Sequence, residues 1–129
     1  MNNFPKGERI NNVNEIDELY AKGDKFMAYP FSVRFIYKPS QSDSKMSVLI
    51  VAPKRYQKLA VNRNKAKRFL REAYRLNKGE LQTKIINLSS QLLISISLVS
   101  KTMPDFHLTE QKMKDILSTI EKKIFSENN

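Results

Sequence analysis

The residues with the clearest chemical character in this sequence are the cations of residues 62–76. Placed on a helix at about 100° per residue, six polar side chains fall within an arc of about 140°. They are Arg63, Asn64, Lys67, Arg68, Arg71 and Arg75. Five apolar side chains fall within about 120° on the other side, namely Ala66, Phe69, Leu70, Ala73 and Leu76. The segment therefore predicts a helix with one packing face and one row of cations.

This row is electrostatically unbalanced. Glu72 is the only acid in the segment, whereas a solvated helix ordinarily places acids three or four residues from its cations. Several cations, Lys65 among them, also crowd the first turns, where the helix dipole repels positive charge. A polyanion lying against the helix N-terminus and the cation row would offset both costs. Asn62 is the expected N-cap.

The whole chain is basic as well. Its 129 residues include 23 Lys and Arg against 13 Asp and Glu, a formal charge of +10. The cations are spread through segments with regular apolar spacing, which indicates a folded basic surface. Candidate partners of such a surface are RNA, DNA and anionic membranes. The membrane is disfavoured, because the apolar arc of residues 62–76 is small and is needed for a core between the flanking strands.

Cysteine usage and hydropathy indicate the compartment. The sequence has no cysteine, which excludes disulfides and cysteine zinc sites and is typical of a reducing environment. Residues 1–14 lack the apolar stretch of a signal peptide, and the run Leu88–Val99 is too short to span a bilayer. We expect a cytoplasmic protein with no membrane partner.

Catalysis by the protein's own side chains is not indicated. The single histidine, His107, has no evident catalytic partner and is expected to be an ordinary surface residue. The acids are scattered and form no metal-ligand pattern, and three glycines are too few for a phosphate-binding glycine-rich loop. We expect neither a catalytic residue nor a metal site in the protein, so that in an enzyme another component would supply the chemistry.

The elements around the cationic helix predict an α+β fold. A short amphipathic helix is expected from residue 14 to Lys22-Gly23. Alternating and apolar runs predict strands over 26–37 and 46–52, joined as a hairpin. Beyond the cationic helix, residues 80–88 are expected to be helical or irregular, followed by a strand over 92–99 and a helix over 113–124. The result is a small α/β sandwich with a mixed sheet of about four strands, about three helices and a strand–helix–strand crossover.

The domain organisation follows from the same pattern. Residues 1–12 are polar and predict a flexible N-terminal arm, while residues 13–129 predict a single RNA-binding domain. On the first strand, Arg34 lies opposite the apolar face, and with Ser32, Ser95 and Ser97 it would line a semi-polar groove. Tyr20 is the strongest candidate among the tyrosines to stack on an unpaired base.

Residues 60–72 read Ala-Val-Asn-Arg-Asn-Lys-Ala-Lys-Arg-Phe-Leu-Arg-Glu. This run resembles the signature of the bacterial ribonuclease P protein component, Ala-Val-x-Arg-Asn-Arg-x-Lys-Arg-x-x-Arg-Glu. The resemblance extends to Lys22-Gly23 after the first helix, an aromatic first strand, and the basic pair Lys54-Arg55 after the second strand. It implies an α/β sandwich with a left-handed βαβ crossover, similar to domain 2 of ribosomal protein S5, although crossovers are generally right-handed.

The resemblance also implies a function. The chain would be the protein subunit of ribonuclease P, which binds a catalytic RNA and the 5′ leader of precursor tRNA and assists the RNA-catalysed removal of that leader. Mg²⁺ bound mainly by the RNA would activate water, and no obligate protein partner is expected. Contacts to the catalytic RNA are expected from Arg63, Asn64, Lys65, Lys67, Arg68, Arg71 and Arg75. A leader-binding cleft is expected from Ile16, Tyr20, Arg34, Lys54, Arg55 and Lys101.

Three positions depart from the family pattern. Lys65 replaces an arginine and lacks the planar fork that grips phosphate. Ile16 stands where the family often has phenylalanine, and Arg34 where it has an aromatic residue, so we expect less stacking and more electrostatic binding here. The alternative function is a non-catalytic RNA-binding module, such as a ribosomal or ribosome-assembly protein, which would not stimulate cleavage of precursor tRNA.

Overall fold

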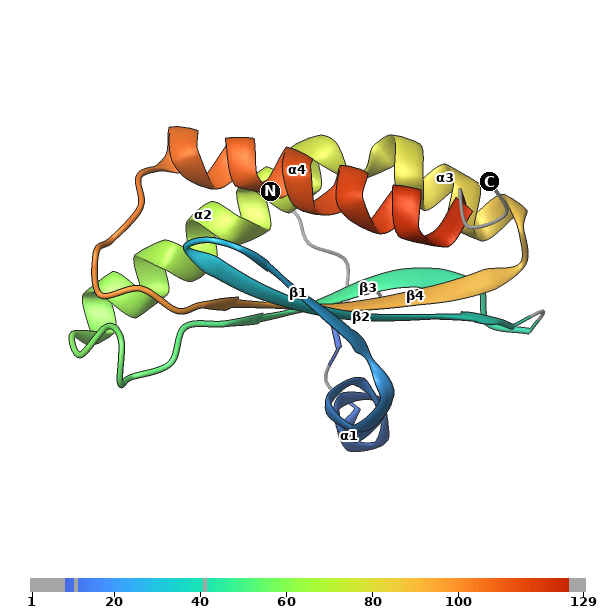
Figure 1. The fold of residues 1–129 in the computed structure, drawn as a ribbon, viewed down its shortest axis with the longest axis horizontal. Coiled ribbons are helices and arrows are strands. Elements are labelled where there is room, and N and C mark those ends of the chain that lie inside the picture. Colours follow the sequence, from blue (N-terminus) through green and yellow to red (C-terminus); the bar gives the residue numbers. More distant parts are fainter. Residues whose placement is uncertain (1–8, 11, 41, 126–129) are drawn as a thin grey trace.

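The chain folds as a four-stranded sheet with three helices on one face and one on the other (Figure 1). A computed structural model describes residues 9–10, 12–40 and 42–125. The elements in order are α1 (Val13–Lys22), β1 (Asp24–Ala28), β2 (Phe31–Pro39), β3 (Lys45–Val51), α2 (Ala60–Asn77), α3 (Gly79–Asn87), β4 (Ser90–Leu98) and α4 (Phe106–Phe125). The predicted α+β class is confirmed, with α3 as a fourth helix where the sequence left helical and irregular conformations open.

The sheet has the strand order β1-β2-β4-β3. β2 pairs antiparallel with both β1 and β4, whereas β3 and β4 are parallel. The predicted hairpin between strands 26–37 and 46–52 is wrong. A turn at Tyr29-Pro30 divides the first of these strands into β1 and β2, which form the hairpin themselves. β4 then lies between β2 and β3, and every residue of β4 except Ser97 is buried, as is typical of a strand covered on both faces of the sheet.

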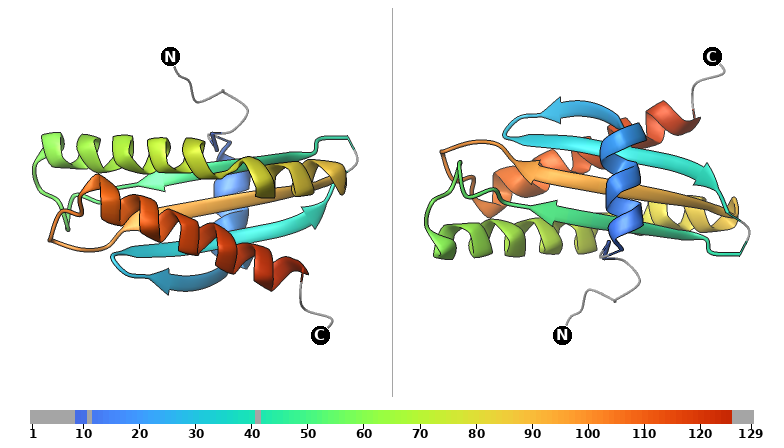
Figure 2. Two further views of the ribbon diagram at one scale, coloured as in Figure 1. Left: turned by 90° about the horizontal axis from the view of Figure 1, so that it is seen from above. Right: turned by 90° about the horizontal axis from the view of Figure 1, so that it is seen from below.

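The connection from β3 to β4 runs through α2 and α3 on the helix-covered face. Viewed from that face with β3 and β4 pointing upward, β4 lies to the left of β3, so this crossover is left-handed (Figure 2). Crossovers between parallel strands are right-handed in about 98% of cases. The unusual hand places α2 along the outer edge of the sheet, beside β3, with one flank open to solvent (Figure 2).

Two apolar clusters hold the layers together. The larger one lies between the sheet and α2, α3 and α4, and includes Phe31, Leu70, Tyr74, Ile94 and Ile116. The smaller one lies under α1 and joins Ile10, Leu19 and Leu93, with Ile16, Ile36 and Leu49 packed around them. Gly23 ends α1 where a side chain would not fit, since an added Cβ would lie 2.5 Å from the carbonyl oxygen of Leu19.

The cationic helix is longer than predicted. α2 begins at Ala60 with Leu59 as its N-cap, and no side chain caps it. The expected cap at Asn62 is wrong, because the Asn62 N–H already donates to the Leu59 carbonyl within the first turn. The packing face includes Ala66, Leu70 and Ala73 as predicted, but also the fully buried Tyr74, while Leu76 is 50% exposed. The face therefore turns farther toward β3 than the sequence predicted.

The segment before α1 reaches the sheet. Arg9 forms a parallel bridge with Val48 of β3, and the Ile10 N–H donates to the Val48 carbonyl at 3.1 Å. Ile10 is 4% exposed. The end of the expected arm is thus seated on the sheet edge, while residues 1–8 and 11 lie outside the described residues. In the part of the chain that the structure describes, no helix is long and apolar enough to cross a bilayer.

Candidate nucleic-acid interface

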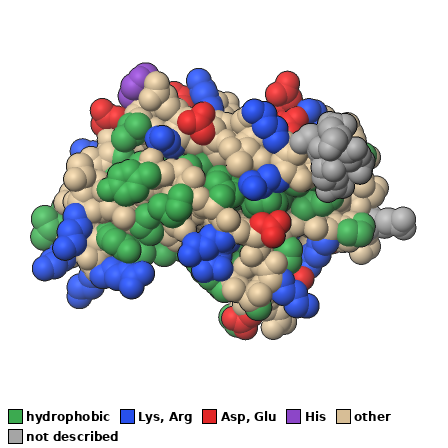
Figure 3. Space-filling view, in the orientation of Figure 1, with side chains coloured by type: hydrophobic (Ala, Val, Ile, Leu, Met, Phe, Trp, Pro, Cys, Tyr) green, Lys and Arg blue, Asp and Glu red, His purple; other side chains and the backbone are tan. Residues whose placement is uncertain are grey.

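The exposed side of α2 carries cations that no carboxylate of the described residues neutralises. Within the described residues, Lys65, Lys67 and Arg68 form no ion pair with a carboxylate. Asn64 is exposed beside them. α2 has no acid in its first turn and no side-chain cap, so its unpaired amides add to the positive potential at this end. Figure 3 shows Lys and Arg gathered near the start of α2 and the loop before it.

Two of these cations lie over one aromatic ring. The Lys65 Nζ is 5.7 Å and the Arg68 Cζ 5.9 Å from the centre of the Phe69 ring. Phe69 in turn packs edge to face against Phe106 of α4, with ring centres 5.7 Å apart. These contacts restrict the two cations without neutralising them, because a ring face attracts a cation and carries no net charge. Lys65 thus lies at the side of the row nearer α4.

Arg63 has a different role in the structure from the one predicted by charge alone. Its Nη1 donates to the carbonyl oxygens of Gln57 at 3.0 Å and Lys58 at 2.8 Å. The guanidinium therefore holds the loop between β3 and α2 against the helix. This loop carries Lys54 and Arg55, so Arg63 positions other candidate residues besides contributing its own charge.

The far end of the row contains Arg75, which forms an ion pair, and Arg71, which forms none with the carboxylates of the described residues. Arg75 pairs with Glu72, with Nη2 and Oε2 2.5 Å apart. The hydrogen bond from Arg75 lowers the pKa of the Glu72 carboxyl, and the same bond raises the pKa of Arg75. Arg71 is half-buried, and burial followed by repulsion from Arg9 lowers the pKa of its guanidinium.

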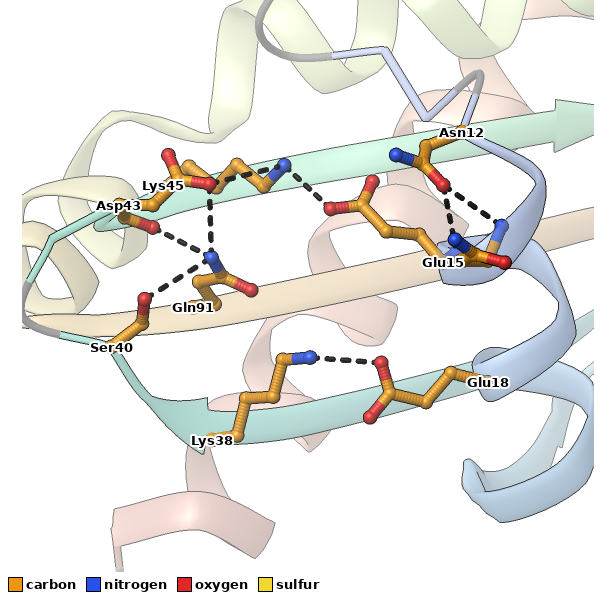
Figure 4. Close-up of polar contacts among 9 residues, drawn as sticks. Asn12, Glu15, Glu18, Lys38, Ser40, Asp43, Lys45 and Gln91 are labelled. Carbon is orange, nitrogen blue, oxygen red and sulfur yellow. Dashed lines mark hydrogen bonds and ion pairs between the residues drawn. The ribbon is translucent and has the colours of Figure 1, made fainter.

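Two cations on the opposite side of the sheet form ion pairs within the protein. There the α1 carboxylates neutralise strand lysines, with Lys38 bonded to Glu18 at 2.8 Å and Lys45 to Glu15 at 2.7 Å (Figure 4). Each pair is partly buried, and both cancel charge on that surface. These two strand lysines therefore differ from Lys65, Lys67 and Arg68 of α2, which form no ion pair among the described residues.

The α1 face of the sheet carries the polar side chains of β2 and β4 that strand alternation predicted to share one face. Arg34 lies opposite Ser95, and Ser32 opposite Ser97, in the β2–β4 register. The Arg34 Cζ lies 5.0 Å from the centre of the Tyr20 ring, and the Tyr20 hydroxyl is hydrogen-bonded to the Ser95 hydroxyl at 3.2 Å. Tyr20 is 44% exposed, so one side of this stacked pair faces solvent. Ile16, in contrast, packs on the apolar cluster under α1.

The remaining cleft candidates meet at one end of the sheet. β3 and β4 are parallel neighbours, with Val51 beside Ser97. The loops that follow these two strands therefore begin at the same end of the sheet. Lys54 and Arg55 are exposed in the first loop and Lys101 in the second. The buried Gln57 side chain joins these loops by donating to the Ser100 carbonyl at 2.8 Å. Sequence reasoning missed Gln57, because nothing in its local pattern indicates so distant a partner.

The groups on this surface are suited to binding a nucleic acid. The described residues contain no group of three His, Cys, Asp or Glu side chains that could hold a metal ion. His107 is exposed at the start of α4. A cationic helix, a stacked Tyr–Arg pair and serine hydroxyls are instead the groups that contact phosphates, bases and sugar hydroxyls. The fold and this surface define an α+β protein of the RNA-binding class.

Comparisons with known proteins identify the family to which this chain belongs. The sequence model of the Ribonuclease P family matches residues 4–121. A ribonuclease P protein component from Porphyromonas gingivalis is 35% identical over 116 residues, which cover 89% of this chain and 84% of that protein. The chain therefore belongs to the ribonuclease P protein component family. It is the accessory protein subunit of an endoribonuclease that acts in tRNA processing with an RNA subunit, and the ribosomal alternative is not favoured.

Solved structures agree with this fold. The RNase P protein of Staphylococcus aureus superposes with a TM-score of 0.66 at 19% identity, covering 88% of this chain and 95% of that one. The RNase P protein of Thermotoga maritima superposes with a TM-score of 0.63 at 22% identity, covering 87% and 96%. At these identities the likeness concerns the backbone fold, and the roles of individual side chains depend on the geometry described above.

Proposed function

We propose that this protein binds the catalytic RNA of ribonuclease P through the cation row of α2 and holds the 5′ leader of precursor tRNA along the α1 face of the sheet. The observation that carries the proposal is the charge on α2, where Lys65, Lys67 and Arg68 have no carboxylate partner among the described residues. Neutralising phosphates with such cations releases counterions and favours binding.

The leader proposal is supported by the shape and chemistry of the second surface. The Tyr20–Arg34 pair offers a flat, partly exposed platform for a base. The loops of Lys54, Arg55 and Lys101 lie at the end of the same sheet and add cations for the backbone. Ile16 contributes by packing α1 onto the sheet, which positions Tyr20.

We assign the Mg²⁺ to the RNA. Mg²⁺ binds through oxygen ligands, usually carboxylates and phosphates, whereas the candidate interface is lined by cations and hydroxyls. The protein's contribution is then to reduce repulsion among the RNA phosphates that surround the ion. This activity belongs to the cytoplasm, where the transcripts are made.

The test is cleavage of precursor tRNA by the cognate catalytic RNA, with and without the protein, across a magnesium titration. The protein should lower the Mg²⁺ concentration needed for half-maximal cleavage, and the gain should be larger for a long leader than for a leader of one nucleotide. Lys114→Ala on α4, an exposed cation away from both surfaces, is the matched control. No stimulation would overturn the proposal, and equal stimulation of both substrates would overturn its leader part.

A further inference from the structure

Two short turns carry the loop cations at the end of the sheet. The first turn follows β3 and is closed by the Gln57 N–H, which donates to the Pro53 carbonyl at 3.2 Å. Lys54 and Arg55 are exposed within this turn. The Arg55 guanidinium also lies over the Tyr56 ring, with its Cζ 5.1 Å from the ring centre. The backbone that carries these two cations is therefore closed by its own hydrogen bond.

The second turn follows β4 and is closed by the Ser100 hydroxyl. The Thr102 N–H donates to the Ser100 Oγ at 3.0 Å, and the same hydroxyl donates to the Thr102 carbonyl at 3.1 Å. Lys101 lies between these two residues and is exposed. A serine side chain that bonds the backbone two residues farther on fixes a turn in one conformation. Lys101 is thus also carried by a closed turn.

Buried hydrogen bonds join the two turns to each other and to the β1–β2 turn. The Gln57 Nε2 donates to the Ser100 carbonyl at 2.8 Å, and the Tyr29 hydroxyl donates to the Ser100 Oγ at 3.3 Å. The Val99 N–H donates to the Pro30 carbonyl at 2.9 Å beside them. All three connections lie at one end of the sheet (Figure 2). Gln57 and Ser100 are each 4% exposed, so these two residues act on a ligand only through the residues that they hold.

We propose that Gln57 and Ser100 are positioning residues for the 5′ leader, which hold Lys54, Arg55 and Lys101 as one fixed set of cations. This inference rests on the proposed leader binding and assigns a role to two buried residues that do not touch the RNA. Ordering a loop or a long side chain during binding costs affinity, and a loop that is already held in its bound geometry avoids that cost. The joined turns therefore present the three cations to the leader with little further ordering of the backbone.

The experiment compares Gln57→Met with Gln91→Met, a matched control at the opposite end of the sheet. Methionine has nearly the length of glutamine but lacks the amide donor. Gln91 is also buried, and its Nε2 donates to the Asp43 carbonyl at 2.8 Å, so the two substitutions remove the same kind of hydrogen bond. The assay is cleavage by the protein reconstituted with its cognate catalytic RNA. The substrates are precursor tRNAs with a long leader and with a leader of one nucleotide.

Gln57→Met should raise the KM for the long-leader substrate about three- to tenfold and leave kcat unchanged, because the cations remain but must be ordered during binding. The KM for the one-nucleotide leader should stay within about twofold, since that substrate does not reach the turns. Gln91→Met should change neither KM, although it should lower the unfolding temperature at least as much. An equal KM shift in the two variants would overturn the inference, and so would an equal shift for the two substrates.

Ser100→Ala is the second variant and decides the test if Gln57→Met does not fold. It removes the hydroxyl that closes the Lys101 turn and accepts from Tyr29. Its control is Ser90→Ala, because Ser90 is a buried serine that donates to the Ile85 carbonyl at 2.9 Å. Ser100→Ala should raise the KM for the long leader, and an effect no larger than that of Ser90→Ala would overturn the inference. Stimulation by the unchanged protein alongside that result would leave the proposed function standing, so the two failures are distinguishable.

Discussion

Arg68→Ala removes the cation that is most clearly available to an external phosphate. Arg68 is exposed on α2, and its one described contact is with the Phe69 ring at 5.9 Å. An exposed cation–ring contact contributes about 0.5–1 kcal/mol, so the free energy of unfolding should fall by no more than that. RNA binding should respond much more strongly than stability.

The size of the binding effect follows from counterion release. One lost phosphate contact lowers the magnitude of the slope of log K against log salt by about 0.7–0.9. Across a fivefold change in salt concentration, the variant should therefore lose about three- to fourfold less affinity than the unchanged protein does. A filter-binding titration of the cognate catalytic RNA at about five salt concentrations resolves a difference of this size.

Lys114→Ala on α4 provides the reference for nonspecific loss of one positive charge. Its slope should match that of the unchanged protein. An unchanged slope for Arg68→Ala, measured on protein with normal thermal unfolding, would refute a phosphate contact at this position. A slope reduction equal to that of Lys114→Ala would show that only net charge matters and that the row on α2 has no special role.

Three further substitutions separate positioning from contact. Arg63→Ala removes two bonds to loop carbonyls and should lower the free energy of unfolding by about 1.5 kcal/mol in a denaturant titration; stability equal to the unchanged protein would refute the clamp. Tyr20→Phe loses the bond to Ser95 and about 1 kcal/mol of stability, but should retain the preference for long leaders, because the ring stays under Arg34. Ile10→Ala should cost about 2 kcal/mol; a loss near zero would mean that the buried segment does not stabilise the sheet.

The cation row was predictable from sequence because its cause is local. Residues 62–76 are adjacent in the chain, and a helix brings every third or fourth side chain to one face whatever surrounds it. The same reasoning predicted the polar face shared by β2 and β4, since alternation along a strand is also local. The choice between Tyr74 and Leu76 for the packing face was missed, because it depends on where β3 and α4 lie relative to α2.

Strand order, crossover hand and the convergence of distant residues required the folded chain. Whether β3 pairs with β2 or with β4 depends on competition among apolar strands, and residues 46–52 have the same local pattern in either arrangement. Gln57 meets Ser100 because β3 and β4 are parallel neighbours, and Arg9 reaches Val48 because the segment before α1 lies along the outer edge of β3. Short-range periodicity thus determines which side of an element is charged, whereas long-range packing determines which charges meet, since those contacts form between segments far apart along the backbone.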